Sequence, residues 1–210
     1  VSSGLSFAPA SDGGVLAPGM LPFWTALAAF FMLGERLDQV RRTGLLIILI
    51  GALMVGLWQI IFNSDEGVWR GHILFLIGSG LFAIYSVIFR QSGLTPLHGL
   101  LIGLFWGTLF ITPILLLTGK VTFHDVSAFD IGITIFIQSL VIGILATILF
   151  NYGVRLIGAS EMGAFGALTP ILAMMGGILF LNESVPPIKM AGIFLAVSYT
   201  HLTLPTKKRG

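Results

Sequence analysis

Long uncharged stretches dominate the chain, and most are about as long as a bilayer is thick. A helix rises about 1.5 Å per residue, so about 20 apolar residues cross a hydrocarbon core of about 30 Å. Seven stretches are candidates: 13–33, 43–62, 71–89, 97–119, 131–154, 162–181 and a shorter one at 187–197. Residues 131–150 carry no charge and no sustained alternation of polarity, which excludes transmembrane β-strands. The pattern predicts an all-α polytopic membrane protein with about seven transmembrane helices.

Composition and charge support this class. Of the 210 residues, 56% are apolar and only 10% are charged, against about 25% charged residues in a soluble domain. A mean hydropathy of +1.00 excludes both a soluble globular domain and a disordered chain. The net charge of +2 indicates no nucleic-acid partner. The absence of cysteine excludes disulfides and Cys-ligated zinc, and we expect neither a cofactor nor a metal.

The loops between the predicted spans differ in basic content. One set contains Arg36, Arg41, Arg42, Arg90 and Arg155, and the other contains Arg70, Lys120 and Lys189. Cytoplasmic loops carry an excess of Lys and Arg, so the first set is expected to be cytoplasmic. The first span then begins on the outer side of a multi-pass protein of the cell membrane, either an inner or a plasma membrane.

Two segments of the chain repeat the same pattern at an offset of 148 residues, which is the separation of Pro22 and Pro170. The matching pairs are Pro22 with Pro170, Leu33 with Leu181, Glu35 with Glu183, and Gly44 with Gly192. The offset carries the first span onto the sixth. Because five is an odd number of spans, the copies should face opposite sides of the membrane. Inverted repeats of this kind are typical of secondary transporters.

A five-span repeat unit sets the expected domain organisation. Residues 1–62 would be the last two helices of a first repeat, and 63–197 a second five-helix repeat with a truncated last helix. We therefore expect about three further spans before residue 1 in the parent protein. Residues 198–210 are similar to translated sequencing-adapter DNA and are left out of the functional reasoning. The alternative is a natural basic tail.

The repeated motif resembles the hallmark of the EamA family in the drug/metabolite transporter superfamily. The first copy reads Leu-Pro-Phe-Trp-Thr-Ala-Leu at 21–27, Leu-Gly-Glu-Arg-Leu at 33–37, and Gly44. The second copy reads Thr-Pro-Ile-Leu at 169–172, Leu-Asn-Glu at 181–183, and Gly192, with Asn182 where the family usually has Gly. The resemblance implies ten helices in two inverted five-helix repeats that export or exchange small metabolites.

The expected function is secondary transport of small organic metabolites, amino acids or similar solutes, by alternating access. Multidrug-type efflux within the same superfamily is the alternative. An embedded enzyme would need a nucleophile–base pair, a metal cluster or paired carboxylates within the spans, and none is recognisable. No charged residue lies near the centre of a span, which argues against a buried-carboxylate proton relay. The expected partners are a small-molecule substrate and the lipid bilayer, and homodimer formation is left open.

Candidate functional residues fall into three groups. The hinge or gate candidates are prolines, which kink a helix, and glycines, which let neighbouring helices approach closely. They are Pro22, Pro170, Gly166 and Gly177. The helix-end motif consists of Glu35, Glu183, Gly44 and Gly192; we favour helix capping by the two glutamates over a gate contact. Polar groups in the spans should face the bundle interior, where they bind substrate or neighbouring helices. These cavity candidates are Tyr85, Trp106, Asn151, Thr147, Gln138 and Trp24.

Overall fold

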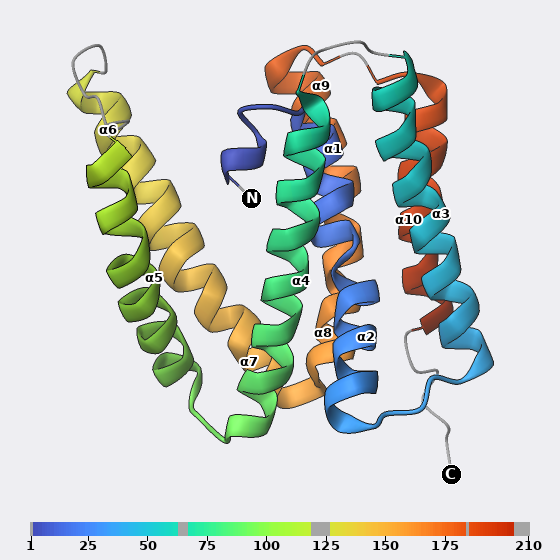
Figure 1. Ribbon diagram of the computed structural model, residues 1–210, viewed down its shortest axis with the longest axis horizontal. Helices are drawn as coiled ribbons and strands as arrows, with labels where there is room; N and C mark the ends of the chain where they lie inside the picture. The colour runs from blue at the N-terminus through green and yellow to red at the C-terminus, as the bar shows by residue number, and fades with distance from the viewer. Residues whose placement is uncertain (1, 63–66, 119–126, 184, 204–210) are drawn as a thin grey trace. The chain divides into compact units, whose positions relative to one another are not determined.

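The computed structural model describes residues 2–62, 67–118, 127–183 and 185–203, and every regular element within these ranges is helical (Figure 1). Six segments are long and apolar enough to cross a membrane: Ala10–Leu33, Gln39–Trp58, Val68–Ser92, Pro96–Leu117, Ala128–Ile157 and Ala159–Leu181. They coincide with the first six predicted spans, which confirms the all-α polytopic class. The seventh prediction falls on α10 (Pro187–Thr203). Residues 204–210 of the proposed tail lie outside the described residues.

The chain divides into two compact units, which are considered separately. Unit 1 comprises residues 1–88 and 158–210, and unit 2 comprises 89–157. Helix α4 (Val68–Ser92) runs across the boundary. The other helices of unit 1 are η1 (Ser2–Gly4), α1 (Ala10–Gly14), η2 (Val15–Gly19), α2 (Leu21–Leu33), α3 (Gln39–Phe62), α8 (Ala159–Phe165), η4 (Gly166–Leu168), α9 (Thr169–Leu181) and α10.

Unit 1 is built around two interrupted helices that run antiparallel. The segment α1–η2–α2 packs against α8–η4–α9 so that α1 contacts α9 and α2 contacts α8. Because α1 precedes α2 and α8 precedes α9, the two segments run in opposite directions, as Figure 1 shows. Among the described residues, α3 and α10 pack against each other most extensively. Together with α4, these helices enclose a core of fully buried apolar side chains: Val15, Ile48, Val55, Phe75 and Ile193.

The two copies of the sequence repeat form helices with equivalent first and last residues. A shift of 148 residues carries α2 (Leu21–Leu33) onto α9 (Thr169–Leu181). Each helix has Pro in its first turn, where a missing N–H costs no helical hydrogen bond. Each proline therefore stands at the start of the helical segment that follows η2 or η4.

Helices α2 and α9 both end at a residue whose backbone is in the left-handed conformation. Gly34 has φ of 66° and Asn182 has φ of 53°. The following backbone N–H groups, of Glu35 and Glu183, then donate to Ala29 O (3.4 Å) and Gly177 O (3.0 Å). Asn is one of the few residues besides Gly that adopt this conformation readily. This backbone requirement explains why Asn182 can replace the glycine of the family motif.

Small residues let the helices of unit 1 approach closely. A Cβ added at Gly192 would lie 2.9 Å from Gly51 O and 3.0 Å from Val55 Cγ2, both on α3. A Cβ at Gly163 would lie 2.8 Å from Thr25 Oγ1. These contacts leave no room for a larger side chain, so close backbone packing accounts for the glycines at these crossings.

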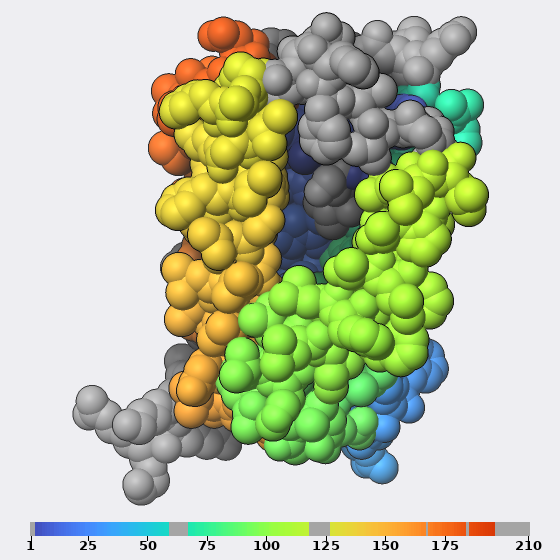
Figure 2. Space-filling view, turned by 90° about the vertical axis from the view of Figure 1, so that its left-hand side faces the viewer, coloured from blue at the N-terminus to red at the C-terminus, as the bar shows by residue number. Residues whose placement is uncertain are grey.

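Unit 2 contains α5 (Pro96–Thr118), α6 (Ala128–Ile135), η3 (Phe136–Ala146) and α7 (Thr147–Ile157). Within it, α5 packs against α7, and Figure 2 shows α5 in green touching the yellow-to-orange helices α6 to α7 near one end only. Arg155 closes this end, because its guanidinium donates to Leu94 O from Nε (2.7 Å) and from Nη2. Most apolar side chains of α5 and α6–η3 are exposed, as expected for helices immersed in lipid.

Candidate functional site

Three ionisable side chains meet inside unit 1. Asp12 on α1 is fully buried, and His72 on α4 and Lys189 on α10 are 5% and 3% exposed. Asp12 Oδ1 accepts a hydrogen bond from Lys189 Nζ at 2.6 Å, and Asp12 Oδ2 lies 3.0 Å from His72 Nε2. This cluster includes a buried carboxylate, and the sequence pattern did not single it out. Each residue lies at the end of its span, and only helix packing brings the three together.

The contact with Asp12 determines which ring nitrogen of a neutral His72 carries the proton. An ionised carboxylate only accepts hydrogen bonds, so the proton facing Asp12 is assigned to Nε2 of the imidazole. The other ring nitrogen, Nδ1, is buried and has no hydrogen-bond partner among the described residues. Nδ1 is therefore free to accept a hydrogen bond when the ring is neutral, or to donate one when the ring is protonated.

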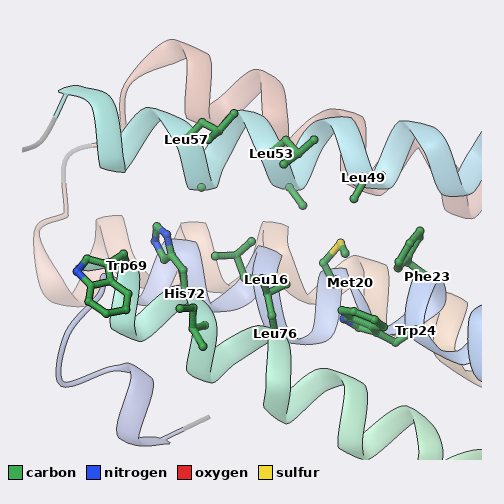
Figure 3. Close-up of a pocket in the computed structure, with 13 residues that line it drawn as sticks. Leu16, Met20, Phe23, Trp24, Leu49, Leu53, Leu57, Trp69, His72 and Leu76 are labelled. Atoms are coloured by element: carbon green, nitrogen blue, oxygen red, sulfur yellow. The ribbon is translucent and has the colours of Figure 1, made fainter. Parts of the chain in front are cut away.

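Beside this cluster lies an apolar pocket with a volume of about 370 Å³. Figure 3 shows Leu49, Leu53 and Leu57 of α3 on one side, and Leu16, Met20 and Leu76 on the other. Three of the lining residues, His72, Trp24 and Trp69, carry a ring nitrogen, and the rest of the lining is apolar apart from Gly56. His72 Nδ1 lies beside Gly56 of α3, where an added Cβ would be 4.0 Å from the nitrogen.

Two buried polar atoms without a partner occur in the described part of the chain, and both belong to residues lining this pocket. They are His72 Nδ1 and Trp24 Nε1. Buried polar groups are nearly always hydrogen-bonded, because leaving one unpaired costs about 1–3 kcal/mol. An unpaired acceptor or donor on a side chain that lines a cavity is therefore a reason to expect a bound molecule there. The pocket offers a donor at Trp24 and a group that can accept or donate at His72.

One member of the predicted helix-end motif, Glu183, lies where the two interrupted helices meet. The Glu183 carboxylate accepts hydrogen bonds from the backbone N–H groups of Ala10 (2.8 Å) and Ser11 (3.2 Å), at the start of α1. This is the capping geometry that the helix dipole favours for an anion. Its repeat partner Glu35 makes no such side-chain contact within the described ranges, although it is half-buried.

The other predicted residues of unit 1 lie within the packed helices. Trp24 is half-buried and lines the pocket, whereas Tyr85 lies further along α4 with its ring 5.8 Å from that of Phe82. The hinge and gate candidates sit where the interrupted helices cross. Pro22, Pro170 and Gly177 are buried there, and a Cβ at Gly166 would lie 3.1 Å from Pro18 O.

In unit 2, the predicted cavity residues interact locally. Asn151 is fully buried and donates from Nδ2 to Pro96 O at 3.3 Å. The Thr147 hydroxyl donates to Ile142 O of its own helical segment at 3.3 Å. Trp106 is 50% exposed and stacks on Phe110, and Gln138 is exposed. The strongest candidate site is therefore the pocket of unit 1, to which the sequence assigned only Trp24.

One signal in the sequence could have located the charge cluster. Asp12, His72 and Lys189 stand at the beginnings of predicted spans that all start on the same side of the membrane. Alternating span directions place these three residues at one end of the bundle. Which pairs of side chains touch depends on the rotation of each helix, and the sequence does not give that rotation.

The architecture is that of a polytopic α-helical membrane protein. The EamA-like transporter family matches residues 69–203, and the chain belongs to this family. The chain is also 22% identical to an uncharacterized transporter, YetK, of Bacillus subtilis (strain 168). That match covers 98% of this chain, which spans 63% of the relative's length. The family predicted from the Pro and Glu motifs is confirmed.

Proposed function

We propose that the protein acts in secondary transport of small organic solutes across a cell membrane, by export or exchange. The observation that carries the proposal is the pocket of unit 1, in which two buried ring nitrogens lack partners beside an interrupted helix. A transporter needs a site that binds solute within the bundle and helices that can change their packing around it. Membership of a transporter family supports the same function.

Alternating access is the mechanism that fits the proposed inverted repeat. The interrupted helices α1–η2–α2 and α8–η4–α9 each have an irregular turn before the proline and a left-handed residue at the end, but they run in opposite directions. Two such elements can exchange their conformations, so that the site opens to one side of the membrane and then to the other. The short η2 and η4 segments are the points at which each helix is least regular.

The test is solute flux in proteoliposomes that contain the full gene product to which this chain belongs. Vesicles loaded with a panel of labelled metabolites, including amino acids and organic acids, should lose at least one of them faster than protein-free vesicles. Trp24→Phe removes the buried Nε1 donor at little cost in volume and should slow that flux about tenfold. The matched control is Trp106→Phe, because the Trp106 ring is half-exposed and stacks on a neighbour in unit 2.

The outcomes separate the proposal from its alternatives. Flux of labelled metabolites that depends on Trp24 but not on Trp106 would support it. Flux of apolar cations without any metabolite flux would indicate multidrug-type efflux instead. No flux for any member of the panel would count against transport.

A further inference from the structure

We propose that the pocket of unit 1 binds an organic monocarboxylic acid with an apolar body, and that the acid binds together with one proton at Nδ1 of His72. This inference rests on the proposed function in one respect, because it takes the pocket as the solute site. It goes further in naming the chemical class of the solute and the residue that receives it.

The charges around His72 exclude a cationic solute. Asp12 and Lys189 form a pair at 2.6 Å, so their charges cancel, and both carboxylate oxygens of Asp12 are already engaged. The described lining of the pocket contains no Asp, Glu, Lys or Arg. Glu183, whose carboxylate also contacts α1, is already held by the N–H groups of Ala10 and Ser11. An ammonium group in this pocket would therefore be buried without a counter-charge, which is costly.

The open nitrogen of His72 suits an acid. Because Nε2–H faces Asp12, a neutral ring presents a lone pair at Nδ1. A carboxylic acid can donate its O–H to that lone pair. It can also transfer the proton, so that the O–H bond breaks, an Nδ1–H bond forms, and a carboxylate faces an imidazolium. Both descriptions contain the same number of protons, so binding the anion from neutral solution takes up one proton.

The resulting site is balanced in charge. A protonated His72 would stand between the ligand carboxylate and the Asp12 carboxylate, and Lys189 already offsets Asp12. The four charges cancel, as buried charges must if the site is to be stable. On the α3 side, the residue near Nδ1 is Gly56, which carries no charge.

The size and the apolar walls of the pocket limit the size and polarity of the part of the ligand that does not contact His72. A volume of about 370 Å³ is at the small end of ligand pockets, and its walls are mainly Leu, with Met20, Phe23 and two Trp rings. An aromatic or branched aliphatic body would bury its surface against these side chains. The Nε1–H of Trp24 provides a second donor for a solute that carries another acceptor.

The experiment is equilibrium binding to the purified full chain in detergent micelles, followed by tryptophan fluorescence. Three probes of the same size are compared: 3-phenylpropionate, 3-phenylpropionamide and 3-phenylpropylamine. Where His72 is neutral in the free protein, the acid should bind about tenfold more weakly for each unit of rising pH, because one proton is taken up. The amide should show no such slope, and the amine should bind the weakest of the three.

His72→Gln should remove the pH slope, because glutamine can still donate to Asp12 but takes up no proton near neutral pH. Circular dichroism checks that this variant is folded. Trp24→Phe should weaken binding and retain the slope, which keeps the test valid if His72→Gln does not fold. His98→Gln is the matched control, because His98 is an exposed histidine bonded to Thr95 in unit 2.

Two results would overturn the inference: acid binding that does not change with pH, or tighter binding of the amine or the amide than of the acid at low pH. Retention of the full slope by His72→Gln would overturn it as well. These failures differ from failure of the proposed function. If the acid binds with the expected pH dependence but is not transported in vesicles, the acid site is supported and the proposed transport of this acid is contradicted. If other solutes are transported in a Trp24-dependent way and the acid does not bind, the transport function is supported and the assignment of the pocket to a monocarboxylic acid is contradicted.

Discussion

Replacing Asp12 by Asn should destabilise the protein strongly, because Lys189 would stay buried without its counter-charge. Lys189 Nζ lies 2.6 Å from Asp12 Oδ1, and the lysine is only 3% exposed. At an effective dielectric constant of about 20, two unit charges at this distance attract by about 6 kcal/mol. Desolvation of both ions offsets much of this attraction, but removing one partner leaves the full penalty of the other, about 3–5 kcal/mol.

A double-mutant cycle separates these two contributions. Asp12→Asn and Lys189→Met are each expected to lower the free energy of unfolding by about 3–5 kcal/mol. The double variant should lie within about 1–2 kcal/mol of the parent, because it leaves neither charge unpaired. The measurement is unfolding in dodecylmaltoside micelles titrated with sodium dodecyl sulfate, followed by circular dichroism.

The exposed pair of Arg41 and Glu161 serves as the control for this cycle. It is also an ion pair, with Nη2 and Oε1 separated by 3.1 Å, but its side chains are 26% and 31% exposed. Removing either charge there should cost no more than about 1 kcal/mol. Strictly additive losses for Asp12→Asn and Lys189→Met, or single losses as small as those at Arg41, would refute the reasoning about the buried pair.

Two further substitutions test the packing of unit 1. Gly192→Leu should cost about 1–3 kcal/mol of stability in the same unfolding assay, because its Cβ would lie 2.9 Å from Gly51 O. Gly103→Leu, which meets no atom within 4 Å, should cost nothing, and an equal loss at both glycines would contradict this explanation. Glu183→Ala should speed hydrogen exchange of the amides at 10–14, where the lost cap is worth about 0.5–2 kcal/mol. Glu35→Ala should leave those amides unchanged, so equal acceleration by both variants would rule out a capping role.

Much of the fold could be predicted from the sequence because a bilayer imposes a local rule. The thickness of the hydrocarbon core sets the length of each apolar run, so the ranges 13–33 to 162–181 located the six spans without any knowledge of contacts. The helix breaks and the equivalent ends at Gly34 and Asn182 are also local, since they follow from backbone geometry at one or two residues.

The candidate site could not be predicted in this way. Asp12 and Lys189 are 177 residues apart and belong to different helices, and each resembles an ordinary residue at the end of a span. For the cavity candidate Asn151, the structure shows a hydrogen bond from Nδ2 to Pro96 O, a partner that its position in the sequence did not indicate. Hydropathy determines which segments enter the membrane. The rotation and crossing of those helices, set by the close contacts of small residues such as Gly163 and Gly192, decide which side chains face one another.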